Sequence, residues 1–420
     1  MKKVIVVAPA LSFSGYGEHA RFVLRSLKTI EDHIDLYLKN TPWGATSYIV
    51  DDSDERAWID HLVSKTIQYE NSENVEPYDI SMQITIPGEW NGNLAATNIG
   101  ITAGTESNKI SPQWFLKSKE MDKIIVVSEH SKSAFVNAEF KTAFQERQER
   151  VFMSKIDSPV EVIGFPYKNI EPSKVNLELE YDFNFLAVGT FIPRKNIENT
   201  IRWFVSEFHD KEVGIILKTS MGKNSLLDRR TTLKRIKNII GDNNKDMKCK
   251  IYFLHGNMTE EEMAGLYNHP KIKGLVNLSH GEGFGLPIFE AACNALPVIT
   301  INWGGQVDYL NMEIKDKKTN KKRKRPMFVP ISYDLRPIQP EAVWGDILVK
   351  ESMWAFPKEW SFRKGLNTFM KNYSTYENLA KKLQIHIQEE FAFQNMSEKF
   401  LKASGLEATS EDKNHETLTL

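Results

Sequence analysis

The sequence has few cysteines, little net charge and no long apolar run, and each absence excludes a class of protein. Cys249 and Cys293 are the two cysteines among 420 residues, so no disulfide framework is implied and a reducing compartment fits. The formal net charge is −1, which gives the chain as a whole no attraction for nucleic acid or an anionic membrane. No segment approaches the ~18 uncharged apolar residues that a membrane span needs.

The start of the chain resembles a signal peptide, because two lysines precede an apolar stretch in MKKVIVVAPAL. That stretch runs into SFSGYGEHAR without a small-residue cleavage site, so we interpret it as a first buried strand followed by a glycine turn. We therefore expect a cytoplasmic protein, and leave peripheral attachment to a membrane open.

Short apolar, β-branched runs alternate with helical patterns along most of the chain. Because the runs lack polar alternation, they suit parallel strands that are covered on both faces. The alternation predicts an α/β fold of doubly wound sheets. The strand candidates are Val4–Val7, Ile80–Ile86, Ile99–Ala103, Ile124–Val127, Phe185–Val188, Gly214–Leu217, Ile251–Leu254, Leu275–Leu278 and Val298–Ile301. The clearest helix candidates are Ile197–Phe208, Ser225–Ile240 and Thr259–Tyr267.

Two such strand–helix series occur, separated near Val160–Lys174, where two prolines interrupt the pattern. We expect one Rossmann-like domain over 1–168 and a second over 178–385. A helix over 386–402 is expected to pack back on the N-terminal domain, and 403–420 is polar enough to be disordered. Asn320–Trp360 has no clear periodicity and is expected to be irregular.

The sharpest motif is SHGEGFGLPIFEAACNALPVI, residues 279–299. A buried strand ends near Leu278, glycines follow, and a helix begins near Leu286. In a parallel sheet, ligands lie beyond the carboxyl ends of strands and over helix N-termini. Glu282 in the loop and Glu290 in the helix suit a hydroxyl-rich ligand, because ionised carboxylates accept hydrogen bonds from hydroxyl groups. On glycine spacing alone, a glycine-rich turn with two solvated glutamates is an equally good interpretation.

Glu282 and Glu290 form E-x7-E inside an HGEGFGLP…EA…PVI frame, which resembles the signature of retaining GT-B glycosyltransferases, and most closely glycosyltransferase family 4. The resemblance implies two Rossmann-like domains facing a central cleft, and a nucleoside-diphosphate sugar as co-substrate, with neither a permanently bound cofactor nor a metal. It places Glu282 on donor-sugar hydroxyls as a catalytic residue and Glu290 on the ribose. Ala295 departs from the family's usual glycine. The loop residues that the resemblance places beside the donor are Gly283, Phe284 and Gly285.

A second motif, FLAVGTFIPRKN, ends a strand and carries Arg194 and Lys195 into the next helix. Cations beside helix N–H groups make an anion site. In the family, the pattern G-R-x-x-x-x-K holds the donor diphosphate. Lys195 matches its lysine, but Thr190 stands at the arginine position, so Arg194 is the candidate substitute. Lys218, at the end of another strand, is a further candidate.

Two stretches of the first domain also resemble the family. Gly15 and Gly17 follow the first strand and match a glycine loop that faces the donor diphosphate across the cleft. Glu106 matches an acidic residue that part of the family places near the reacting sugar, so it is a second catalytic candidate, and Thr102 is a weaker one. Ser128 is expected to cap a helix.

Two sequence features that could indicate a metal site are interpreted in other ways. The aspartates of Asp51–Asp54 contain D-x-D, but they precede a helical stretch and are interpreted as a helix cap. His255 and His280 have no second ligand at zinc spacing, and His280 is expected to border the donor site instead.

The acceptor and the oligomeric state stay open. Eight of the eleven residues in Lys315–Arg325 are Lys or Arg, so the acceptor or a partner could be polyanionic, either DNA or a membrane surface, against a solvated surface loop as the alternative. The family resemblance allows a polysaccharide, a lipid-linked sugar, a protein or a modified DNA base as acceptor. The rival interpretations are a GT-B epimerase or phosphorylase, or a sugar-nucleotide-binding protein with a decayed site.

Overall fold

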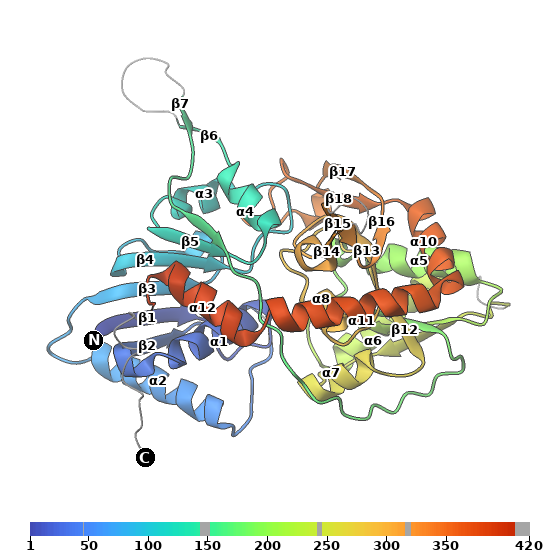
Figure 1. Cartoon of the computed structure of the whole chain (residues 1–420), viewed down its shortest axis with the longest axis horizontal. Helices are drawn as coiled ribbons and strands as arrows, with labels where there is room; N and C mark the ends of the chain where they lie inside the picture. The colour runs from blue at the N-terminus through green and yellow to red at the C-terminus, as the bar shows by residue number, and fades with distance from the viewer. Residues whose placement is uncertain (45, 143–151, 242–245, 316–320, 408–420) are drawn as a thin grey trace.

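Two parallel six-stranded sheets lie side by side, each flanked by helices (Figure 1). This computed structural model describes residues 1–44, 46–142, 152–241, 246–315 and 321–407. The N-terminal part of the chain, in blue to cyan, builds one α/β unit, and the later part, in green to orange, builds the other. The predicted α/β class is confirmed.

The first sheet has the spatial order β2-β1-β3-β4-β5-β8. Its strands are β1 (Lys2–Ala8), β2 (Ile34–Asn40), β3 (Tyr78–Ile84), β4 (Ala95–Thr102), β5 (Lys123–Val126) and β8 (Val160–Val162). The helices of this unit are α1 (Gly15–Lys28), α2 (Asp54–Glu70), α3 (Pro112–Ser118) and α4 (Glu129–Val136). Val4 and Val6 pack toward α1, while Ile5 points to the opposite face, beside Tyr37 and Tyr78. Burial on both faces explains why β1 reads as a continuous apolar run.

The second sheet has the order β11-β10-β9-β12-β13-β16, which in its own chain order is 3-2-1-4-5-6. Its strands are β9 (Asn184–Val188), β10 (Gly214–Lys218), β11 (Lys250–Leu254), β12 (Ile272–Asn277), β13 (Val298–Ile301) and β16 (Val329–Ile331). The strand order reverses between β9 and β12. In doubly wound sheets this switch point opens a crevice at the carboxyl ends of the two strands, so it positions the site.

Helices cover both faces of the second sheet, because its strands alternate the direction of their apolar side chains. Phe185 and Ile215 face α5 and α10, while Leu186 and Ile216 face α8 and α11. The helices are α5 (Ile197–Phe208), α6 (Leu226–Ile240), α7 (Glu260–Tyr267), α8 (Leu286–Cys293), α9 (Val307–Leu310), α10 (Glu359–Lys371) and α11 (Tyr373–Glu390). Thr259 and Glu262 close a capping box at the start of α7.

The C-terminal helices connect the two units. Helix α11 lies along the second unit, and after a break at Phe391 and Ala392, α12 (Phe393–Ser404) crosses to the first (Figure 1). There Phe22 of α1 meets the rings of Phe393 and Phe400, at centroid distances of 6.3 and 5.9 Å. The helix expected over 386–402 thus begins at residue 393 and ends at Ser404. Of the segment expected to be disordered, 408–420 lies outside the described residues, while Leu406 is buried in the first core.

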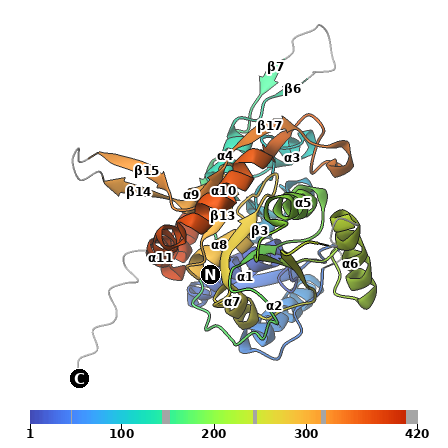
Figure 2. The same cartoon turned by 90° about the vertical axis from the view of Figure 1, so that its right-hand side faces the viewer.

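Three antiparallel pairs extend the two units. They are β6 (Phe140–Thr142) with β7 (Phe152–Ser154), β14 (Asn311–Lys315) with β15 (Lys322–Pro326), and β17 (Tyr333–Pro337) with β18 (Met353–Pro357). Figure 2 shows that β14 and β15 extend away from the body. Residues 320–360 were expected to be irregular. This expectation was wrong, because the segment contains strands β15 to β18. These strands are short, and their pairing partners supply regularity that a local pattern does not reveal.

The helices of the described ranges offer no candidate for crossing a bilayer, because none joins sufficient length to sufficient apolar character.

Candidate active site

The loops after β9 and β12 meet at the switch point of the second sheet. A short 3-10 turn, Pro193–Lys195, presents Arg194 and Lys195 from the β9 side. Asn196 follows with a left-handed φ of 53°, and its side-chain amide donates to the carbonyl of Leu278 at the end of the β12 strand region. The β9 loop is therefore fastened to the loop that carries Glu282.

Glu282 is the centre of an ionic cluster. Lys195 Nζ lies 2.5 Å from Oε1 of Glu282, and Arg194 Nη1 lies 3.1 Å from Oε2. The aliphatic chain of Lys195 runs along Gly189, where a Cβ would lie 3.4 Å from Lys195 Cδ. The guanidinium of Arg194 thus lies beside Lys195, although Thr190 stands where the motif that the sequence resembles has arginine.

The charges of this cluster are fixed by its surroundings. Burial by itself raises the pKa of Glu282, but the adjacent Lys195 and Arg194 outweigh burial and lower the pKa to about 2. Burial also lowers the pKa of Lys195, and the Glu282 carboxylate opposes that effect. Glu282 is 5% exposed, so an ionised carboxylate is held almost out of contact with solvent.

Glu106 completes the cluster from the first domain. Its Oε1 lies 3.4 Å from Arg194 Nη2, so the guanidinium bridges two carboxylates from different domains. Glu106 and Glu282 therefore face the same cation, and the structure brings four predicted residues together: Arg194, Lys195, Glu282 and Glu106.

The glycines of the motif lie against the backbone of the other domain. A Cβ on Gly281 would lie 1.8 Å from the carbonyl oxygen of Glu106, and one on Gly283 would lie 2.4 Å from that of Ala103. Gly285 has φ +88° and begins α8. From the sequence, these glycines were explained by close approach to a ligand; the structure adds the close contact between domains as a reason for Gly281 and Gly283.

Further contacts close the cleft beside this loop. Ser128, the N-cap of α4, donates to the carbonyl of Gly283 at 2.6 Å. The backbone N–H of Glu129 donates to Asp308 at 2.7 Å. Burial raises the pKa of Asp308 to about 6, against the lowering effect of that N–H. A Cβ on Gly305 would lie 1.8 Å from the Gly283 carbonyl oxygen.

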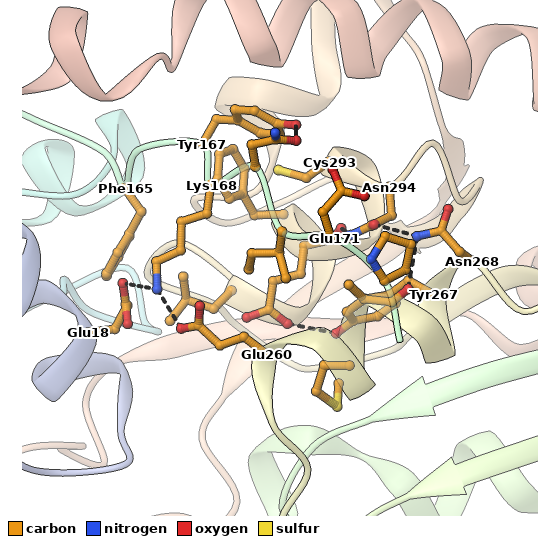
Figure 3. Close-up of a pocket in the computed structure, with 18 of the residues that line it drawn as sticks. Glu18, Phe165, Tyr167, Lys168, Glu171, Glu260, Tyr267, Asn268, Cys293 and Asn294 are labelled. Carbon is orange, nitrogen blue, oxygen red and sulfur yellow. Dashed lines mark hydrogen bonds and ion pairs between the residues drawn. The ribbon is translucent and has the colours of Figure 1, made fainter. Parts of the chain in front are cut away.

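A cavity of about 390 Å³ lies between residues 165–172 (here called the linker), α7 and α11, and Glu290 of α8 is one of the residues that line it. Figure 3 shows this cavity. The hydroxyl of Tyr267 donates to Glu290 Oε2 at 2.8 Å. Burial raises the pKa of Glu290 to about 7, even though the Tyr267 hydrogen bond acts in the opposite direction. This carboxyl group therefore changes its charge near neutral pH.

Lys168, on the linker, joins the two domains at this cavity. Its Nζ lies 2.7 Å from Glu18 of α1 and 2.6 Å from Glu260 of α7 (Figure 3). Glu18 also pairs with Arg21, 3.0 Å away. Neither Lys168 nor its partners was predicted from the sequence, because a lone lysine in a linker carries no local signal. The E-x7-E motif pointed to Glu290, but not to the residues across the cavity from it.

The remaining predicted residues lie around these two places. Gly15 starts α1, and a Cβ there would lie 3.7 Å from Leu286, the first residue of α8. Gly17 packs on its own turn, where a Cβ would lie 2.0 Å from the Ser12 oxygen. The ammonium of Lys218 donates to the carbonyl of Gly256. The hydroxyl of Thr102 lies 2.6 Å from that of Tyr16.

The residues that could have indicated a metal site make contacts within the protein. Ser53 caps α2, and Asp51 accepts from its backbone and hydroxyl. His255 Nε2 lies 2.9 Å from Asp228. The ring of His280 stacks on Trp354 at 5.1 Å, and its Nδ1 lies 2.7 Å from the Ala355 carbonyl, while its place at the border of the donor site stays a prediction. Within the described ranges, no group of three or more His, Cys, Asp or Glu side chains is arranged to hold a metal.

Comparison with known proteins gives partial sequence matches to mannosyltransferases and many matches of fold. No protein-family model matches the chain. The serotype-specific mannosyltransferase WbdA of Escherichia coli is 32% identical over 119 residues, which are 28% of this chain and 13% of that protein. The match therefore spans a small part of the relative's length.

Solved structures match over nearly the whole chain. Sucrose-phosphate synthase from Thermosynechococcus elongatus superposes with a TM-score of 0.61 at 13% identity, covering 96% of this chain and 98% of that one. HepE of Anabaena, solved in complex with UDP-glucose, superposes with a TM-score of 0.56 at 13% identity, covering 96% and 100%. The chain therefore has the two-domain GT-B fold of glycosyltransferases.

Proposed function

We propose that this protein is a retaining glycosyltransferase that moves a sugar from a nucleoside-diphosphate sugar to an acceptor hydroxyl without a metal. One observation carries the proposal: an ionised, buried Glu282 lies between Lys195 and Arg194 at the switch point, with Glu290 eight positions further along, in the adjoining cavity. Two carboxylates and two cations supply what a sugar nucleotide offers, which is hydroxyl protons and a diphosphate.

The cations act on the leaving group. As the bond from the anomeric carbon to the diphosphate breaks, negative charge grows on the leaving phosphate oxygen, and Lys195 with Arg194 offsets it. The N–H groups that begin α8, after Gly285, favour the same anion. Arg194 fills the role that Thr190 cannot, which supports an intact pair of cations over a decayed site.

The carboxylates orient the donor. Glu282 accepts hydrogen bonds from sugar hydroxyls, and Glu290, ionised above its pKa of about 7, accepts hydrogen bonds from the ribose hydroxyls. Glu106 holds Arg194 from the first domain and lies beside the reacting sugar. The acceptor oxygen then bonds to the anomeric carbon on the face that the phosphate leaves, and its proton passes to the departing phosphate oxygen. This front-face displacement retains the anomeric configuration without an enzymic nucleophile.

Closure of the two domains supports this chemistry. Loops of the first domain lie directly on Gly281 and Gly283, so closure brings Glu106 to Arg194 and excludes water from the cluster. The sequence relative is a mannosyltransferase and one structural neighbour is solved with UDP-glucose, so GDP-mannose and UDP-glucose are the first donors to test.

A modified DNA base as acceptor is the second candidate. The observation that favours it is the exposed basic pair β14–β15, which directly follows helix α9, whose Asp308 contacts the first domain. The same basic residues fit peripheral attachment to an anionic membrane.

A donor screen tests the proposal. UDP-, GDP- and ADP-sugars are compared by thermal shift, and the consumed donor is followed by NMR in the presence and absence of EDTA. We expect at least one donor to stabilise the protein and to release sugar with the donor's anomeric configuration, with EDTA present. Inverted product or a metal requirement would contradict the mechanism, and no stabilisation by any donor would favour the decayed site.

A further inference from the structure

The antiparallel pair β14–β15, here called the basic ribbon, is a concentrated positive charge on a chain with net charge −1. Its ten strand residues include five cations and one acid, Glu313. All five cations are exposed. They are Lys315, Lys322, Arg323, Lys324 and Arg325. Lys322 lies 3.4 Å from Glu313, which neutralises a fifth of this charge at most.

The register of the basic ribbon puts cations on both of its faces. Residues directly opposite each other in an antiparallel pair share a face. Arg323 and Arg325 therefore share one face with Ile314 and Met312, while Lys322 and Lys324 share the other with Lys315 and Glu313. Because all five cations are exposed, a grooved ligand can contact cations of both faces, whereas a flat surface meets those of one face.

The apolar side chains of the ribbon are half-buried. Met312 and Ile314 pack against the core of the second domain. Surface-bound membrane segments insert large apolar residues among the lipid chains. Among the described ribbon residues, none is a large apolar side chain of high exposure, so charge is what the ribbon offers to a partner.

The shape of the ribbon favours one class of polyanionic ligand, duplex DNA. It projects from the body (Figure 2). Two strands lie about 4.8 Å apart, and the major groove of duplex DNA, about 12 Å wide, admits a two-stranded ribbon. Lysines and arginines on both faces would reach the phosphates on both walls of the groove. We propose that the basic ribbon binds the grooved, phosphate-lined surface of duplex DNA.

The root of the ribbon follows a contact between the two domains. Asp308 in α9, three positions before β14, accepts from the backbone N–H of Glu129 in the first domain. The ribbon is therefore anchored near the place where the two domains meet. The binding needs no donor, so it stands apart from the transfer reaction.

The test measures binding of the full chain to a fluorescent DNA duplex of about 20 bp by anisotropy, without donor, between about 50 and 200 mM salt. The test variant is K322Q/R323Q/K324Q/R325Q. The matched control is R229Q/R230Q/K234Q/K237Q. It also removes two lysines and two arginines, but from exposed positions on α6, on the far side of the molecule from the ribbon (Figure 2).

We expect wild type and the α6 variant to bind with equal affinity, and the ribbon variant to bind at least about tenfold more weakly at the lower salt. The slope of log affinity against log salt should flatten by about one for each phosphate that the ribbon variant no longer neutralises. Circular dichroism checks that both variants fold.

Three results would overturn the proposal: no binding of duplex by wild type at about 50 mM salt, equally weakened binding by both variants, or ribbon-dependent binding to phosphatidylserine–phosphatidylcholine vesicles without ribbon-dependent binding to duplex. Donor consumption is measured for both variants in parallel. Its failure would count against the proposed transfer reaction, while the anisotropy result alone decides the role of the ribbon.

Discussion

Glu282 and Glu290 lie eight positions apart, yet their surroundings move their pKa values in opposite directions. Burial acts to raise both, but Glu282 has two cations within contact distance and its pKa falls to about 2. Glu290 has the Tyr267 hydroxyl as its close partner, and its pKa rises to about 7. The E-x7-E spacing alone does not predict this difference in pKa, because the two pKa values depend on residues from the loop after β9, from α7 and from the linker.

The raised pKa of Glu290 predicts a pH-dependent cost of folding. The unfolded carboxyl has a pKa of about 4.3, so between there and about 7 the native state holds a proton that the unfolded state has released. Wild-type stability relative to Glu290→Gln should therefore fall as pH rises, by on the order of 2 kcal/mol between about pH 5 and pH 7. Denaturant titrations of both proteins at each pH measure it. A difference that is flat or rises with pH would refute the assignment.

Ala295 departs from the family's glycine at a position where the backbone is left-handed, with φ 53°. An L-residue in that region costs roughly 1–2 kcal/mol, partly offset by the greater freedom of glycine when unfolded. Ala295→Gly should therefore stabilise the protein by about 1 kcal/mol, as measured by chemical denaturation.

The control for that substitution lies in the helix that precedes Ala295. Ala292→Gly, in the last turn of α8, should destabilise the protein by about 1 kcal/mol or more, because its backbone is helical. Equal signs for the two substitutions would show that the backbone conformation at residue 295 is not what matters.

At the scale of elements, the long apolar strands and the capped helices followed from sequence, because their periodicity and their N-caps are local. The capping box at Thr259 and the strand at Val298–Ile301 are examples. Strand β2 (Ile34–Asn40) was missed, and so were the strands between 320 and 360, because they depend on distant partners. The last helix was expected to begin at residue 386 but begins at Phe393. Its position also depends on a distant partner, because Phe400 of α12 packs on Phe22 of the first domain.

The linker shows which part of the candidate site the sequence did not reveal. The motifs led to Glu282, Lys195 and Glu106, which the fold brings into one cluster. They did not lead to Lys168, whose importance comes from lying between Glu18 and Glu260 of different domains. Such a position is created by folding and has no sequence pattern of its own.

Lys168→Met removes two ion pairs that hold the two domains together. We therefore expect it to weaken donor binding, because the closed arrangement of the domains is less stable without them. The two ion pairs are partly exposed, so their contribution is about 1 kcal/mol, or about fivefold in affinity. The dependence of donor affinity on salt should also diminish. Calorimetric titration with the donor at two salt concentrations measures both effects.

Lys381→Met is the matched control, because Lys381 pairs with Glu377 within α11, away from the cavity. Equal weakening by the two substitutions would remove the reason to assign Lys168 a role in closure.

At the scale of the whole molecule, the two domains meet through glycines that leave no room for a side chain. Gly281→Ala places a Cβ 1.8 Å from the Glu106 oxygen, so the first domain must move away from the Glu282 loop. We expect donor turnover to fall by at least about 10²-fold, while circular dichroism stays unchanged because each sheet is intact.

Gly88→Ala serves as control, since its nearest neighbour would lie 3.7 Å from the new Cβ. It should turn over donor at the wild-type rate. Normal turnover by Gly281→Ala would mean that the close contact between the domains is not needed for the reaction.

The central claim is that Glu282 contacts the donor sugar while Lys195 and Arg194 hold its diphosphate. The most direct measurement compares wild type with Glu282→Gln for two quantities: the dissociation constant of the nucleoside diphosphate alone, and the rate of sugar release from the full donor. We predict a diphosphate affinity no weaker than that of wild type, because the two cations are released from Glu282, together with sugar release slower by about 10²-fold or more. Sugar release at the wild-type rate would contradict the claim.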